Sequence, residues 1–478
     1  MGDIKSKAIT GVKWNTVSIV FVMIVQILRL SVLTRLLEKT DFGLIAIATM
    51  VIGFTDIFSE LGLTVAVIHK QDISDKQYSS VFWTNIILSV LVFAILCLVS
   101  PLVSFFYNEP QLIAIIPLLG VQILLNSFGK MFQTIKSKNL EFEFLSKVRI
   151  YACIFGFSVT VVLAFMKWGV YSLVFGQLAQ VALMQACYTI EGRKEQKILW
   201  HLNFKEISDF IKIGSFRLGS QVLDFISSKI DVFLIGKFFG MDDLGIYNLA
   251  KDLITRPFGI VNMLTSSVAS AAFAKIQNNM QMVCDYYMRI LNIISTLTIP
   301  IYTMLFIAAD LIVKILYGSN YPEVAVLLRI LCFYGIECSI SSQGAILQVA
   351  MGRTDIGFKW TLIRILFTLG IIIIVSNMSI YEVAYGQLLL SLLSLYLFWK
   401  IAVNPIININ IINYLKVFTR PFFVSSVLVI PFFVLPFYSN YVFQIIYIVL
   451  YFGFFLLYYW IFQKQQLLNI YHLIQNKK

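Results

Sequence analysis

Long apolar runs recur along this chain, and only short polar gaps separate them. Each run has about 18 to 28 residues, which matches the roughly 20 residues that a helix needs to cross a bilayer. Only 13% of the 478 residues are charged, and the mean hydropathy is +0.84. A soluble domain carries about 25% charged residues, so we exclude a soluble fold. We predict an all-α polytopic membrane protein, because a membrane barrel would show weaker alternating segments of about 10 residues.

The runs predict fourteen transmembrane helices, an even number that places both chain ends on one side of the membrane. Their expected bounds are 12–36, 42–68, 80–106, 112–134, 143–166, 169–190, 207–236, 244–272, 284–308, 323–349, 358–376, 381–402, 417–437 and 442–462. The polar, basic segment 1–10 precedes a run that is too long for a cleaved signal peptide, so we expect that run to remain as the first span.

Basic residues gather in alternate gaps. Lys136 and Lys138 lie in one such gap and Arg193 and Lys194 in another, whereas the intervening gaps hold few positive charges. The positive-inside rule then places the basic gaps and both termini in the cytoplasm. The net charge of +12 belongs mainly to these loops, and it does not indicate a nucleic-acid partner.

Cysteine and histidine give no sign of metal or redox chemistry. The six cysteines lie in or beside apolar runs without a C-x-x-C pair, and the three histidines are scattered. We therefore expect buried, reduced thiols, no metal site and no cofactor.

An internal repeat relates two parts of the sequence at a distance of 202 residues. This shift places Arg35 on Lys237, and residues 41–43 (Asp-Phe-Gly) on residues 243–245 (Asp-Leu-Gly). Six spans separate the two copies, so both have the same orientation, as in transporters with parallel repeats. We predict an N-terminal lobe over 1–200 and a C-terminal lobe over 201–403, related by a pseudo-twofold axis. Residues 404–478 then form two additional spans and a cytoplasmic tail.

Polar and charged residues form stripes on spans one, two, seven and eight. Charged groups inside a membrane usually face a cavity or a partner, because their insertion costs about 2.5–3.5 kcal/mol each. The candidate central-cavity residues, which we expect to bind substrate, are Asn15, Gln26, Arg29, Asp56, Glu60, Arg217, Gln221, Asp224, Ser228, Asp231, Asn248, Lys251, Asp252 and Arg256. Two other interpretations remain open, namely ion pairs inside the bundle and an amphipathic surface helix over 206–230.

Short motifs add a resemblance to a known family. They are Gly11-Val12-Lys13-Trp14, Leu33-Thr34-Arg35-Leu36-Leu37, Asp41-Phe42-Gly43-Leu44, Asp243-Leu244-Gly245-Ile246-Tyr247 and Leu316-Tyr317-Gly318. The sequence resembles polysaccharide flippases of the multidrug/oligosaccharidyl-lipid/polysaccharide exporter (MOP) superfamily. Within that superfamily it looks most similar to the branch for O-antigen, colanic-acid-like or teichuronic-acid-like repeat units.

This resemblance implies a flippase in a bacterial cytoplasmic (inner) membrane. It would move polyprenyl-pyrophosphate-linked oligosaccharides from the cytoplasmic to the outer leaflet by alternating access, for surface polysaccharide biosynthesis. Arg29, Arg217 and Arg256 are our candidates for phosphate, and Asp224, Asp231 and Asp252 for sugar or a coupling cation. We expect membrane lipid, a coupling proton or sodium ion and a glycan polymerase as partners, a monomeric state and no catalytic residue.

Three further classes of function stay open at this point. A drug/cation antiporter of the same superfamily usually stops at twelve spans. A membrane glycosyltransferase or polymerase normally carries a sizeable extracytoplasmic loop, and a purely structural scaffold would not need buried charges.

Overall fold

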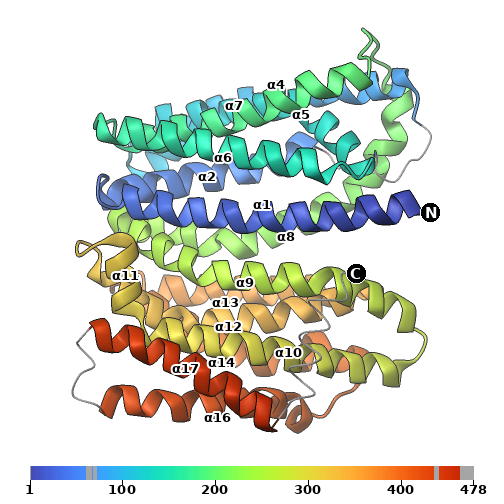
Figure 1. Cartoon of the computed structure of the whole chain (residues 1–478). Coiled ribbons are helices and arrows are strands. Elements are labelled where there is room, and N and C mark those ends of the chain that lie inside the picture. Colours follow the sequence, from blue (N-terminus) through green and yellow to red (C-terminus); the bar gives the residue numbers. More distant parts are fainter. Residues whose placement is uncertain (1, 61–66, 68–72, 435–440, 463–478) are drawn as a thin grey trace. The chain divides into compact units, whose positions relative to one another are not determined.

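The structure is a computed structural model that describes the backbone of residues 2–60, 67, 73–434 and 441–462. Every regular element in that part of the chain is a helix (Figure 1). The chain forms two compact units, Met1–Gly245 and Ile246–Lys478.

Within its described residues, the first unit contains seven long helices and the start of an eighth. They are α1 (Gly2–Leu33), α2 (Lys39–Glu60), α4 (Asp75–Tyr107), α5 (Leu112–Lys138), α6 (Phe142–Phe165), α7 (Val170–Glu195), α8 (Phe204–Phe238) and the first residues of α9 (Gly240–Ile276). Helix α6 packs on α1 and α7, and α5 packs on α4 and α7. The unit extends past the predicted lobe boundary at residue 200 because α8 packs on α2 and α4. The division into lobes of six spans stays a prediction.

The second unit contains the remainder of α9 and the helices that follow it. They are α10 (Met280–Ile307), α11 (Ala309–Tyr317), α12 (Pro322–Ala350), α13 (Thr354–Ile374), α14 (Ile380–Phe398), a π-helical turn (Trp399–Val403), α15 (Asn404–Ile407), α16 (Ile411–Val434) and α17 (Tyr441–Phe462). Helix α10 packs on α12 and α16, and α12 packs on α14.

A helix lies in each of the fourteen predicted spans, which confirms the predicted fold class. Residues 61–66 and 68 of the second predicted span and 435–437 of the thirteenth are outside the described residues. Within the described residues, twelve of these helices are long and apolar enough to cross a membrane. The other two, α8 and α9, stand at the seventh and eighth predicted positions and carry most of the predicted polar stripe. The stripe was predicted from the polar and charged residues that recur at helical spacing in these two segments.

Local signals fix where several helices begin and end. The Ser74 hydroxyl accepts the Gln77 N–H at 3.3 Å, and the Gln77 side chain accepts the Ser74 N–H at 3.2 Å. This capping box satisfies two of the N–H groups that a helix start leaves unpaired. Asn108 then ends α4 in a left-handed conformation with φ of 58°.

The order of helices follows the repeat predicted from the sequence. Helix α1 begins at Gly2 and α8 at Phe204, which is 202 residues later. Helix α7 begins at Val170 and α14 at Ile380, which is 210 residues later. The difference arises because α11 lies between α10 and α12, whereas the corresponding connection between α4 and α5 is residues 108–111.

The repeated glycines Gly43 and Gly245 make a reciprocal contact inside the first unit. A Cβ atom at Gly43 would lie 2.0 Å from the Met241 carbonyl oxygen, and one at Gly245 would lie 2.1 Å from the Lys39 carbonyl oxygen. Met241 is the 202-residue counterpart of Lys39. Each glycine therefore contacts a residue of the other copy, and the 202-residue shift relates the two contacts. Such close backbone approach is typical of helix crossings in membranes, where small residues allow tight packing.

We expect Gly43→Ala and Gly245→Ala each to lower the free energy of unfolding by about 1–3 kcal/mol, because the methyl group would overlap backbone atoms that cannot rotate away. The measurement is unfolding of the purified protein by titration with SDS in mixed micelles, followed by circular dichroism. The control is Gly259→Ala in α9, where no atom lies within 4 Å of the added Cβ. The control should be neutral or up to about 1 kcal/mol more stable. Equal stability of all three variants would contradict the crossing.

Candidate functional site

The predicted polar residues of α1 lie against α6. Asn15, Gln26 and Arg29 are all half-buried. The Arg149 guanidinium on α6 donates to the Asn15 side-chain oxygen at 3.4 Å. The Arg29 guanidinium lies near Cys153, which follows Arg149 by one turn of α6. In the described structure this part of the stripe is therefore engaged, at least partly, by groups of its own unit.

The predicted residues of α8 are mostly exposed. The side chains of Gln221, Asp224 and Ser228 are exposed, and the Ser228 hydroxyl donates to the Phe225 carbonyl at 2.9 Å. Asp231 is only 5% exposed, and its carboxylate accepts the Val232 N–H at 2.8 Å. A helix in a membrane protein that exposes an amide, a carboxylate and a hydroxyl at steps of three and four residues presents one polar face.

Three further predicted positions are Asp56, Glu60 and Arg217. Asp56 on α2 is half-buried. Glu60 and Arg217 lie in α2 and α8, and their side chains are outside the described residues.

The predicted residues of α9 belong to the second unit. Asn248 and Lys251 are half-buried. Asp252 and Arg256 pair with each other, since the Arg256 Nη2 lies 2.5 Å and its Nε 3.0 Å from the same Asp252 oxygen. Tyr317 of α11 is buried beside this pair and donates to the Leu249 carbonyl at 3.2 Å. The structure thus favours an ion pair within the bundle for these two residues, which was the open alternative.

The second unit contains a buried ion pair that was not predicted from the sequence. Glu337 on α12 and Arg364 on α13 lie 3.4 Å apart, with side chains 2% and 22% exposed. The Ser341 hydroxyl donates to the other Glu337 oxygen at 2.5 Å. The guanidinium also lies over the Tyr334 ring, 5.7 Å from its centroid. Glu337 and Arg364 lie inside the predicted spans 323–349 and 358–376, whose other charges, Glu323, Arg329 and Lys359, lie nearer the span ends, and these two inner charges of opposite sign were the available signal.

Two polar clusters in the first unit also went unpredicted. Lys136 at the end of α5 is 3% exposed and pairs with both Glu141 and Glu195. One ammonium therefore connects the end of α5 to the start of α6 and to the end of α7. Between α5 and α7, the Gln177 amide donates to Gln122 at 2.9 Å. In both clusters, buried polar or charged side chains pair with one another, as buried polar groups usually do.

No group of three or more potential metal ligands occurs among the described residues. The arrangement consists of a polar, exposed helix face and internally paired charges.

Solved structures share this all-helical arrangement of long helices. The chain superposes on the lipid II flippase MurJ in an inward closed conformation with a TM-score of 0.74 and 15% identity, covering 93% of this chain and 98% of that one. An inward-facing multidrug resistance MATE family transporter of the MOP superfamily gives a TM-score of 0.62 and 13% identity, covering 86% and 98%. At these identities the similarity concerns the fold.

The particular family follows from the sequence. The model of the family described as "Polysaccharide biosynthesis protein" matches residues 32–326, and the chain belongs to this family. This confirms the predicted resemblance.

The relatives agree with this assignment. The teichuronic acid biosynthesis protein TuaB of Bacillus subtilis (strain 168) is 26% identical over 427 residues, which cover 89% of this chain and 88% of the relative. The lipopolysaccharide biosynthesis protein WzxC of Escherichia coli (strain K12) is 23% identical, with 88% and 86% covered. The succinoglycan biosynthesis transport protein ExoT of Rhizobium meliloti (strain 1021) is 22% identical, with 84% and 79% covered.

We expect Glu337→Ala to lower the free energy of unfolding by about 3 kcal/mol, because it leaves the Arg364 charge buried without its partner. The double variant Glu337→Ala/Arg364→Met should regain most of that loss. The measurement is the same SDS unfolding titration. The control is Asp355→Ala, which breaks an exposed pair with Arg353 (Nε–Oδ1 3.1 Å) and should cost less than about 1 kcal/mol. An effect of Glu337→Ala no larger than that of the control would contradict a buried, interdependent pair.

Proposed function

We propose that the protein is a flippase that moves polyprenyl-pyrophosphate-linked oligosaccharide repeat units from the cytoplasmic to the outer leaflet, for surface polysaccharide biosynthesis. The observation that carries the proposal is the family match over residues 32–326 in a chain with a transporter fold. Relatives named for teichuronic acid, lipopolysaccharide and succinoglycan biosynthesis support it along most of the chain.

Bilayer energetics explain why such a substrate needs a protein. A charged, hydroxyl-rich head group cannot cross about 30 Å of hydrocarbon unaided. The exposed face of α8, with Gln221, Asp224 and Ser228, offers the mixed donors and acceptors that sugar hydroxyls need. We place this face on a central, water-filled cavity that opens alternately to the two sides of the membrane, with both termini in the cytoplasm of an inner-membrane protein.

Arginines are the proposed phosphate ligands. The planar guanidinium binds paired phosphate oxygens through two N–H groups, and this role falls to Arg29, Arg217 and Arg256. Arg256 is held by Asp252, so a pyrophosphate would have to replace one carboxylate with another anion. The exchange would release Asp252 for a sugar hydroxyl or for a coupling proton or sodium ion. The protein would act as a monomer and pass its product to a glycan polymerase.

The structure favours transport over the enzymatic alternatives. Within residues 73–434 the longest segment outside a helix runs from Gln196 to Asn203. Membrane glycosyltransferases and polymerases need a sizeable loop to hold their catalytic groups, and no longer loop than this occurs within residues 73–434. The two additional helices α16 and α17 also favour a polysaccharide exporter over a drug antiporter of twelve spans.

We expect the double variant Arg29→Ala/Arg217→Ala to reduce glycan export at least about tenfold, because each lost charge-assisted hydrogen bond to phosphate is worth about 1.5–3 kcal/mol. The measurement is surface polysaccharide in cells that lack their own copy of this flippase and carry the variant. The control is Lys167→Gln, which removes an exposed positive charge between α6 and α7. Export at the wild-type rate by the double variant, at equal protein level, would refute the cavity assignment.

A further inference from the structure

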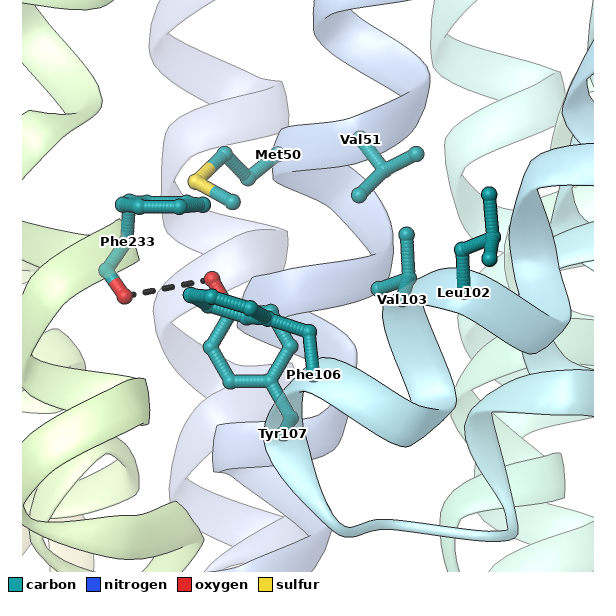
Figure 2. Close-up of a pocket in the computed structure, with 7 residues that line it drawn as sticks. All are labelled: Met50, Val51, Leu102, Val103, Phe106, Tyr107 and Phe233. Atoms are coloured by element: carbon teal, nitrogen blue, oxygen red, sulfur yellow. Dashed lines mark hydrogen bonds between the residues drawn. The ribbon is translucent and has the colours of Figure 1, made fainter.

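Helix α4 has a different environment at each of its ends. At its end, Phe106 and Tyr107 line an apolar groove together with Phe233 of α8, and the Tyr107 hydroxyl donates to the Phe233 carbonyl at 3.1 Å (Figure 2). Phe233 follows Asp224 by nine residues, about two and a half turns, so the groove lies on the side of α8 opposite the polar face. At its start, α4 contacts the connection between α7 and α8, residues 196–203, which carries exposed aromatic and basic side chains.

Hydrogen bonds hold this connection against the first turns of α4. The Trp83 Nε1–H donates to the Leu199 carbonyl at 2.9 Å, and the Leu199 N–H donates to the Ser79 hydroxyl at 2.9 Å. The Asn203 N–H donates to the Ser80 hydroxyl at 3.2 Å. Because these residues of α4 stand at the beginning of the third predicted span, the connection lies at the depth where α4 enters the membrane.

Trp200 supplies the apolar part of this surface. Its ring stacks on the Trp83 ring with centroids 4.4 Å apart, and Trp200 is nevertheless 91% exposed. Leu199 and Leu202, close to it in the sequence, are also exposed. Tryptophan is enriched at membrane–water interfaces, because its ring is apolar while its N–H can stay hydrated. The stack on Trp83 therefore presents an indole ring to the lipid interface.

Basic residues flank the exposed tryptophan. Arg193 in the last turn of α7, Lys197 in the connection and Lys76 in the first turn of α4 are all exposed. The ion pairs in the described part of the chain involve none of these three residues. Asp75, the acidic residue next to Lys76, accepts a hydrogen bond from the Gln196 amide at 2.7 Å. The surface thus combines positive charge with exposed apolar side chains.

We propose that this surface binds the head group of an anionic phospholipid, with the lipid phosphate on Arg193 and Lys197 and the Trp200 ring beside the upper acyl chains. The charges are complementary, and the depth of the connection places the indole where head groups and acyl chains meet. The bound lipid is a component of the bilayer and is distinct from the transport substrate. The inference therefore goes beyond the proposed function and does not depend on it.

The test measures lipid preference beside this surface. The full chain, with a dansyl amino acid at Leu202, is reconstituted in mixtures of phosphatidylcholine and phosphatidylglycerol that is brominated in its upper acyl chains. Bromine quenches the dansyl group only at close range, so quenching reports which lipid is adjacent. We expect about a 25-fold preference for phosphatidylglycerol, because each of two basic residues contributes about fivefold. A dansyl group at Val162, an exposed apolar residue of α6, should report no preference.

Variants identify the contacts. Arg193→Gln and Lys197→Gln should each reduce the preference about fivefold, and the double variant should remove most of it. Trp200→Ala should shift the dansyl emission to longer wavelength, because the connection loses its main apolar contact with lipid. The matched control is Lys167→Gln, which removes an exposed positive charge from the turn between α6 and α7 and should leave the preference unchanged. Thermal unfolding checks that each variant is folded.

Three results would overturn the proposal. The first is equal quenching by brominated phosphatidylglycerol and brominated phosphatidylcholine at Leu202. The second is a preference that survives in the Arg193→Gln/Lys197→Gln double variant. The third is loss of the preference in excess inorganic phosphate at constant ionic strength, which would make the surface a site for a soluble phosphate compound. Glycan transport enters none of these measurements, so their outcome leaves the flippase proposal to its own export assay.

Discussion

Gly43 and Gly245 allow the backbones of α2 and α9 to touch at the point where both helices begin. Lipid chains are as apolar as the side chains that face them, so helices in a bilayer associate chiefly through close packing and hydrogen bonds. The reciprocal approach to Met241 and Lys39 leaves no room for any side chain at the two glycines. Helices α1 and α8 end immediately before this crossing, and α2 and α9 start at it. The four helices that carry the polar stripe therefore each begin or end close to this crossing.

The helices could be predicted because the bilayer permits so few alternatives. A spanning segment must satisfy its own backbone groups, so each apolar run of sufficient length becomes a helix. The repeat was recognisable near residues 34–44 because Asp41 and Gly43 recur as Asp243 and Gly245. The same two glycines allow the close backbone contacts of the crossing. The short amphipathic helix α11 was not predicted, because nine residues give too little periodicity to separate a helix from a connection. Its insertion is also what hides the repeat in the later spans.

Charge was harder to interpret than hydropathy, because the sequence shows where a charge lies but not which group faces it. Asp252 and Arg256 are four residues apart, a spacing equally suited to an ion pair and to two ligands on one face. Arg149 contacts Asn15 across 134 residues, and Glu337 meets Arg364 across 27. Such pairs arise from packing of different helices. An acidic residue deep in an apolar run nevertheless predicts an opposite charge nearby, and for Glu337 the sequence offered both Arg329 and Arg364.

The two kinds of polar group in this protein solve the same energetic problem differently. Glu337 and Lys136 avoid the cost of a charge in hydrocarbon by pairing inside their units. Asp224 is exposed on α8, and a carboxylate at such a position is tolerable only where water or a polar ligand reaches it. The opposite face of the same helix meets an apolar groove, at Phe233. One helix thus carries a polar face and, on its opposite side, an apolar one.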